Sequence, residues 1–285
     1  MIIVVATTVE GVADVQDHLR TLGVAPTEVR APSEVRRLVL APMPDEARGA
    51  SVVSRLRADG QIAVLRPEAG PRLEAWMRHS RPIAIGQQLC LCFTWSEHDR
   101  RGLSRVVELD PDGGFGSGQH PSTRLLLEVL AARIVGGERV IDVGCGSGVL
   151  ALSALRLGAS SAVGVDVEAD AVEATRRNAA LNGFGPRVEA RLPPMNEIGG
   201  VFDVVLANIG RAALLELSAD LSRLVSPGGW MAVSGIAPTQ SSVVAAAMRP
   251  LEVVEDRTCD EWSALVFAYR RAEHSVSESG PCSRH

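Results

Sequence analysis

The sequence predicts an α/β protein in which a doubly wound, mostly parallel sheet of seven strands follows a small N-terminal α+β domain. Three observations support this fold class. Short β-branched runs alternate with helix-like segments after about residue 105, which is typical of sheets built from strand–helix–strand units. A glycine-rich turn lies between the first of these strands and its helix. Polar residues follow successive strands, at the sheet edge where such folds bind ligands.

The seven expected strands are short runs, most of them apolar and rich in β-branched residues. Helices are expected to begin near Gly148, Ala169, Arg211 and Thr239. No convincing helix separates the last two strands, so we expect a hairpin that places one antiparallel strand in the sheet. Pro227-Gly228-Gly229 is expected to form a tight turn before the fifth strand. The expected strands are Val140–Val143, Ala162–Val165, Val188–Arg191, Val204–Ala207, Met231–Ser234, Glu252–Glu255 and Ala264–Ala268.

Residues 1–65 are expected to form the small α+β domain. Thr7 and Glu10 have the spacing of a capping box, which predicts a helix start there. A second helix is expected to run to about Arg57. The domain's expected strands are Ile2–Ala6, Val35–Leu40 and Ile62–Leu65.

The rest of the chain divides into three parts. Residues 66–104 are expected to form a linker with a short helix, Leu73–Met77, and a strand, Leu89–Phe93. Cys90 and Cys92 fall on one face of that strand because the strand period is two. Residues 105–272 form the expected domain with the large sheet. Residues 273–285 are polar and are expected to be disordered.

The composition argues against several classes of function. The 285 residues carry a net charge of -5, so no bulk positive charge favours direct binding of nucleic acid. All 29 basic residues are arginine. The five cysteines form no CxxC pair, so we expect no metal site, and their scattered positions favour reduced thiols in a cytoplasmic protein. No apolar run approaches the roughly 18 residues of a membrane span.

The glycine-rich turn is the main indication of a ligand. Gly144, Gly146 and Gly148 lie between the strand Val140–Val143 and the helix that follows it. Glycines there let a ligand approach the backbone without an intervening Cβ. A dinucleotide fingerprint would place its third glycine at position 149, which is valine. The spacing therefore favours S-adenosylmethionine, which has no phosphate.

Two further polar positions reinforce the site. Asp166 ends the second strand, where an acid can accept hydrogen bonds from both ribose hydroxyls of a nucleoside. An acid at that point can also favour a helix N-terminus, but Glu168 and Asp170 are available for that role, which would leave Asp166 for the ligand. Asn208 ends the fourth strand at the same expected edge.

A fourth segment resembles a known family signature. The run from Glu108 to Thr123, ELDPDGGFGSGQHPST, is similar to a segment of the bacterial methyltransferases that modify the eleventh protein of the large ribosomal subunit. The glycine turn, Asp166 and Asn208-Ile209 follow in the order of that family. The resemblance extends from about Arg81 to Tyr269 and implies a Rossmann-like, seven-stranded methyltransferase sheet.

The resemblance implies S-adenosyl-L-methionine as cofactor. It places cofactor contacts on Thr123, Gly144, Asp166 and Asn208. Gly146 lies in the same glycine turn as Gly144. The loop containing Phe115 and Gly116 has one aromatic side chain and the flexibility to cover a bound cofactor. Thr123 or Ser122 could instead serve only as a helix cap.

The function implied by the resemblance is methyl transfer to amino groups of a protein, most simply a ribosomal protein. The resemblance is faint over residues 1–65, which contain none of the expected cofactor positions, so we expect them to recognise the substrate. Gly210-Arg211 stands where the family usually has Leu-Ala. This departure leaves open a small-molecule or peptide methyltransferase with an amine-bearing acceptor. A non-catalytic regulator that binds S-adenosylmethionine is a further alternative, which the intact segment from Asp110 to Thr123 argues against.

Methyl transfer to an amine needs a neutral amine and accurate alignment more than a strong base. The sequence therefore predicts no obligate catalytic side chain. Asn208 could orient the amine. His120 could accept a proton, although a single histidine in a loop more often has a structural role.

Overall fold

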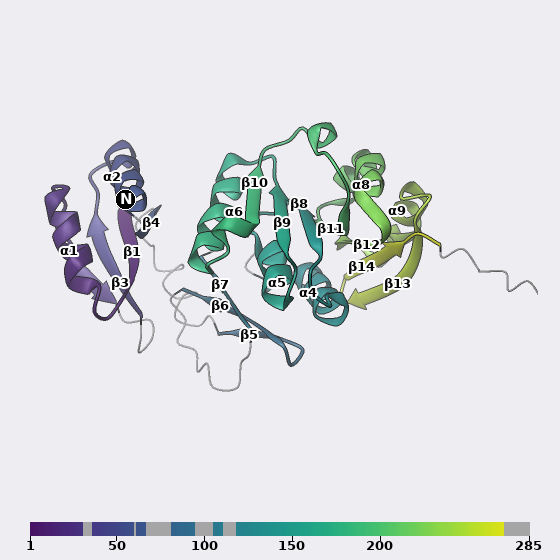
Figure 1. The fold of residues 1–285 in the computed structure, drawn as a ribbon, viewed down its shortest axis with the longest axis horizontal. Helices are drawn as coiled ribbons and strands as arrows, with labels where there is room; N and C mark the ends of the chain where they lie inside the picture. Colours follow the sequence, from purple (N-terminus) through teal and green to yellow (C-terminus); the bar gives the residue numbers. More distant parts are fainter. Residues whose placement is uncertain (31–35, 60, 67–80, 95–104, 111–117, 271–285) are drawn as a thin grey trace, which may run out of the picture.

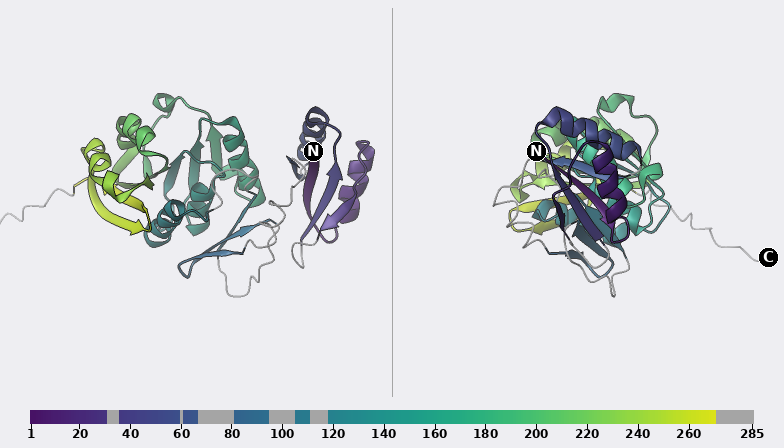
Figure 2. Two further views of the ribbon diagram at one scale, coloured as in Figure 1. Left: turned by 180° about the vertical axis from the view of Figure 1, so that it is seen from behind. Right: turned by 90° about the vertical axis from the view of Figure 1, so that its left-hand side faces the viewer.

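The computed structural model describes residues 1–30, 36–59, 61–66, 81–94, 105–110 and 118–270 (Figure 1). A small N-terminal unit lies beside a larger body, on the side where α6 (Ala169–Leu181) and β7 (Val106–Leu109) are found. The views in Figure 2 place the C-terminal hairpin at the opposite end of that body. No helix within the described ranges is long and apolar enough to cross a membrane.

The N-terminal unit is an antiparallel sheet covered by helices on one face. Its strands, in the order β2-β3-β1-β4, pair with β1 between β3 and β4. Side chains alternate along β1, so that Ile3 and Val5 are fully buried against the two helices. The bounds are β1 (Ile2–Thr8), α1 (Val12–Thr21), β2 (Glu28–Arg30), β3 (Arg36–Pro42), α2 (Glu46–Ala58) and β4 (Ile62–Arg66).

The expected start of the first helix is wrong. Thr7 still belongs to β1, where it pairs with Arg37, and the N-cap of α1 is Gly11. The side chain of Thr8 accepts a hydrogen bond from the Gly11 N–H at 3.2 Å. Pairing with β3 therefore extends the strand through Thr7, the first residue of the capping-box pattern, to Thr8, because the ladder satisfies their backbone groups.

The seven-stranded sheet confirms the predicted fold class. Its order is β10-β9-β8-β11-β12-β14-β13, in which β14 runs opposite to the other six strands. The predicted C-terminal hairpin is thus confirmed. The strands are β8 (Arg139–Val143), β9 (Ser161–Val165), β10 (Val188–Arg191), β11 (Phe202–Asn208), β12 (Val225–Ile236), β13 (Glu252–Cys259) and β14 (Trp262–Ala268).

Helices cover both faces of this sheet. Because side chains alternate along a strand, neighbouring residues contribute to the hydrophobic cores on opposite faces. Val140 and Val204 belong to the cluster with α4 and α5, whereas Ile141 and Val205 belong to the cluster with α7, α8 and α9. Three short 3-10 turns, Gly185–Arg187, Met195–Glu197 and Pro238–Gln240, lie in the connections. The helices are α4 (Pro121–Arg133), α5 (Val149–Leu157), α6, α7 (Arg211–Glu216), α8 (Ser218–Leu224) and α9 (Ser241–Ala247).

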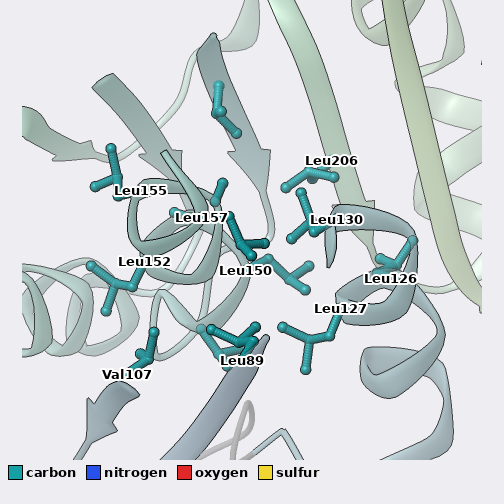
Figure 3. Packing of buried hydrophobic residues seen from close by; sticks show 14 of the residues in the cluster. Leu89, Val107, Leu126, Leu127, Leu130, Leu150, Leu152, Leu155, Leu157 and Leu206 are labelled. Atoms are coloured by element: carbon teal, nitrogen blue, oxygen red, sulfur yellow. The ribbon is translucent and has the colours of Figure 1, made fainter. Parts of the chain in front are cut away.

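A three-stranded sheet, β5-β6-β7, packs on the outer side of α4 and α5. It consists of β5 (Ile83–Ile85), β6 (Leu89–Phe93) and β7. In Figure 3, leucines of α4 and α5 lie between Leu206 of β11 and the pair Leu89 and Val107 of the small sheet. Because α5 has a sheet on each side, all of its residues except Arg156 are buried, as an all-round apolar helix requires.

The prediction for Pro227-Gly228-Gly229 needs correction. These residues lie inside β12, which begins at Val225. The register with β11 shifts there, from Phe202 opposite Val225 to Val204 opposite Trp230. The strand therefore bulges at the proline and glycines instead of starting after them. The expected linker helix Leu73–Met77 and the tail 273–285 lie outside the described residues.

Candidate cofactor site

The glycine turn joins β8 to α5 at the carboxyl edge of the large sheet. All three glycines have positive φ, with 78° at Gly144 and 81° at Gly148. A Cβ on Gly144 would lie 2.3 Å from Cγ2 of Ile209, and a Cβ on Gly148 would lie 3.0 Å from Cγ2 of Thr175. The turn therefore requires glycine both for its dihedral angles and for the close approach of neighbouring segments.

Asp166 follows β9 and lies beside the glycine turn, where its carboxylate accepts two hydrogen bonds from the backbone. One carboxylate oxygen accepts the Gly146 N–H at 2.9 Å, and the other accepts the Glu168 N–H at 3.1 Å. The expectation that Glu168 and Asp170 would leave Asp166 without a role near the helix start is therefore wrong. A carboxylate has about four acceptor positions, so two remain for ligand hydroxyls.

Asn208 and Thr123 meet across 85 residues of sequence. Nδ2 of Asn208, at the end of β11, donates to Oγ1 of Thr123 in the first turn of α4 at 2.9 Å. Thr123 is buried, and Asn208 is half-buried. The next residue, Ile209, is held between glycines: a Cβ on Gly235 would lie 2.5 Å from the carbonyl oxygen of Ile209. The position of Asn208 is thus fixed by the chain on both sides.

His120 caps α4. Its Nδ1 accepts the Ser122 N–H at 3.3 Å and lies 2.7 Å from Oγ of Ser122. A neutral ring that accepts at Nδ1 carries its proton at Nε2, which leaves no ring lone pair free for a substrate proton. The geometry therefore favours the structural role of His120 over a role as base.

A cavity of about 750 Å³ lies where these segments converge, which is within the range of small-molecule sites. Of the residues expected at the site, His120, Thr123, Gly144, Gly146 and Asn208 line it. Asp166 is not among the lining residues, but it accepts a hydrogen bond from Gly146, which is. Phe115 and Gly116, which were also expected there, lie outside the described residues.

Two groups at the glycine turn have strongly shifted pKa values: the carboxyl of Asp142 beneath the turn and the thiol of Cys145 within it. Burial raises the pKa of Asp142 to about 7, against a hydrogen bond from the Ala151 N–H, and the charge of Asp166 adds to the rise. Burial also raises the pKa of the Cys145 thiol to about 12, assisted by the charge of Asp142. Cys145 therefore stays a protonated, unreactive thiol, since the thiolate is the nucleophile.

Sequence reasoning missed several residues of this edge. Val167 and Leu192, which follow β9 and β10, are 77% and 48% exposed. Trp262, at the start of β14, lines the cavity and meets the His120 ring edge-on at 4.6 Å between centroids. The position next to Asp166 was a usable signal for Val167. Nothing in the sequence indicated that the C-terminal hairpin would bring Trp262 to His120.

Comparison with known proteins identifies a family. Residues 72–270 match the family described as ribosomal protein L11 methyltransferase (PrmA). A ribosomal protein L11 methyltransferase of Geobacter sp. (strain M21) is 40% identical over 199 residues, which are 67% of this chain and 65% of that protein. One from Vibrio cholerae (strain O395) is 42% identical over 192 residues, 67% of this chain and 64% of that protein.

A solved structure is similar as well. The ribosomal protein L11 methylase of Lactobacillus delbrueckii subsp. bulgaricus superposes with a TM-score of 0.60 and 26% identity, covering 67% of this chain and 99% of that one. Matches to the first curated relatives thus cover slightly less than two thirds of those relatives' length.

Proposed function

The chain belongs to the ribosomal protein L11 methyltransferase family, and from this membership we propose that it transfers methyl groups from S-adenosylmethionine to amino groups of a ribosomal protein. One observation carries the proposal. The glycine turn and the pair Asn208–Thr123 come from distant segments and line a single cavity at the carboxyl edge of the sheet, and Asp166 accepts a hydrogen bond from Gly146 of that lining. Such edges bind ligands in open α/β sheets.

The residues present suit this cofactor. The glycine turn lacks side chains where the aminoacyl part would approach, and Asp166 keeps acceptor capacity for ribose hydroxyls. Val167 and Leu192 present apolar surface at the same edge, which suits the faces of an adenine ring. Phe115 and Gly116 remain proposed contacts by family resemblance. When bound, S-adenosylmethionine supplies an electrophilic methyl group.

The protein's part in the reaction is to align the acceptor amine. We assign this to Asn208, because its hydrogen bond to Thr123 fixes the amide and Ile209 is held between Gly144 and Gly235. Accurate placement of reacting groups can supply several kcal/mol. The helix-capping bonds of His120 argue against a general base there, so we assign deprotonation of the amine to solvent. A ribosomal acceptor also makes the cytoplasm the proposed site of action.

Binding is tested first by calorimetric titration with S-adenosylmethionine, S-adenosylhomocysteine and NAD. We expect binding of the first two and none of NAD. Binding of NAD without S-adenosylmethionine would contradict the proposal.

Transfer is tested with S-adenosylmethionine labelled in its methyl group and purified large-subunit protein L11. The chain has no lysine, so its own side-chain amines cannot compete as acceptors and label in the L11 band is unambiguous. A cell lysate serves as the second acceptor mixture. Label that enters only the small-molecule fraction of the lysate would select the alternative, a small amine-bearing acceptor.

A further inference from the structure

The outer edge of β7 is completed by two asparagine side chains instead of a strand. On its inner side β7 pairs with β6. On the other side, Asn182, the C-cap residue of α6, accepts the Glu108 N–H at 2.9 Å and donates to the Glu108 carbonyl at 2.7 Å. Asn178 accepts the Asp110 N–H at 2.8 Å and donates to the Asp110 carbonyl at 3.3 Å.

The spacing of helix and strand makes this double pairing possible. Positions 178 and 182 are one helical turn apart on one face, a rise of about 6 Å. Glu108 lies in β7 and Asp110 directly follows its last residue, and two residues along an extended chain are about 6.6 Å apart. The two amides therefore match the two backbone pairs. Glu108 and Asp110 are both buried, so unpaired backbone groups there would carry the cost of lost hydrogen bonds.

Asn178 has a further contact that Asn182 lacks. Its Nδ2 also donates to the carbonyl of Ser147 in the glycine turn, at 2.9 Å. Thr175, one turn earlier on α6, donates to the carbonyl of Gly146 at 3.0 Å. One face of α6 therefore holds the glycine turn at one end and β7 at the other. Asn178, which is fully buried, contacts both.

We propose that Asn178 is a positioning residue for cofactor binding, which fixes the distance between the glycine turn and the end of β7. Asp110 directly follows β7, and Asn178 pairs with both of its backbone groups. The inference rests on the proposed function, because it concerns the same cofactor. Asn178 acts through Ser147 and Asp110 and is not itself a catalytic residue.

The test compares Asn178→Ala with Asn182→Ala. Both variants leave buried backbone groups of β7 unpaired, so both should lower the melting temperature. Only Asn178→Ala removes the bond to the glycine turn. We expect it to weaken binding of S-adenosylmethionine by about tenfold or more, and Asn182→Ala to change binding by less than about threefold, in calorimetric titration.

Hydrogen exchange of the ligand-free protein gives an independent readout. Asn178→Ala should speed exchange of the Gly146 and Gly148 amides, whereas Asn182→Ala should leave them unchanged. If the alanine variant does not fold, Asn178→Ser, which keeps a small polar group in the site, takes its place in both measurements.

The outcomes separate the two proposals. Equal affinities of Asn178→Ala and the wild type, or equal losses in both variants, would overturn the positioning role. Failure of the wild type to bind S-adenosylmethionine would instead overturn the proposed function, and would be seen before any variant is compared.

Discussion

Replacing Asp142 by asparagine should make the protein's stability less dependent on pH. Asp142 is fully buried below the glycine turn, where Oδ2 accepts the Ala151 N–H at 3.2 Å. Oδ1 has no hydrogen-bond partner among the described residues. Burial, opposed by the bond from Ala151 and assisted by the charge of Asp166, raises the pKa of this carboxyl from 3.8 to about 7.

The direction of the pH effect on stability follows from how many protons the folded and the unfolded protein bind. Between about pH 4 and pH 7 the folded protein keeps the proton of Asp142, whereas the unfolded chain releases it. The free energy of unfolding therefore falls as the pH rises through this window, and stays lower above it. A pKa difference of about 3 corresponds to roughly 4 kcal/mol, an upper value for one buried group. Asparagine does not titrate, so this contribution is absent from the variant.

The measurement is thermal unfolding of wild type and Asp142→Asn from pH 4.5 to 8 at constant ionic strength. Other carboxyls titrate in both proteins, so the difference between the two melting temperatures isolates Asp142. We expect that difference to move in favour of the variant by about 2–4 °C for each kcal/mol as the pH rises.

A second variant controls for the new amide. The Nδ2 group of asparagine introduces a donor whose burial can cost about 1–3 kcal/mol, but this cost is independent of pH. Asp142→Leu removes the carboxyl without adding a donor, and must show the same pH trend despite a different absolute stability. A difference in melting temperature that stays constant across the range in both variants would refute the reasoning.

Three further predictions concern the cofactor and the N-terminal unit. Asp166→Ala should weaken binding of S-adenosylmethionine by about 1–3 kcal/mol in calorimetric titration, and an unchanged dissociation constant would remove Asp166 from the site. Gly144→Val should abolish that binding, because its Cβ would displace Ile209 and its φ is 78°; retained affinity would mean that the turn tolerates a side chain. Deletion of residues 1–65 should leave the cofactor's dissociation constant within about threefold but lower methyl transfer to L11 at least about a hundredfold, because substrate positioning is lost. Full transfer by the folded, truncated protein would contradict a substrate-recognition role.

The central strands β8, β9 and β11 could be predicted because they are largely buried in a sheet that helices cover on both faces. Val188–Arg191 was predicted with its observed bounds, and β8, β9 and β11 were each within two residues at either end. A strand covered by helices on both sides must be apolar throughout, which makes it visible in sequence. Three of the candidate cofactor positions were visible for a related reason: Gly144 and Asp166 directly follow such strands, and Asn208 ends one.

Short edge strands could not be predicted in the same way. β2 and β5 have three residues each, and β7 has four. β7 is completed on one side by Asn178 and Asn182, whose positions on α6 give no local sign of a strand 70 residues earlier. The two structural bonds of Asp166 were missed for the same reason, since they depend on how the glycine turn folds back over β9.

The sheet of the N-terminal unit has two apolar faces, and the sequence alone does not predict what covers each of them. In β1, Ile3 and Val5 face α1 and α2, which is the pattern of a separately packed unit. The opposite face is also apolar: Leu40 of β3 belongs to the same buried cluster as α4 and α5, and Ile2 and Val4 pack against that cluster. A strand that is apolar on both faces predicts burial but not the partner. Deletion of residues 1–65 would therefore uncover part of the cluster that supports α5 and the glycine turn. If the truncated protein keeps its cofactor affinity and loses only transfer, the face with Leu40, Ile2 and Val4 serves only to attach the N-terminal unit to the larger body. If the truncated protein loses cofactor binding as well, the two units share one hydrophobic core, and the predicted domain boundary at residue 65 cuts through that core.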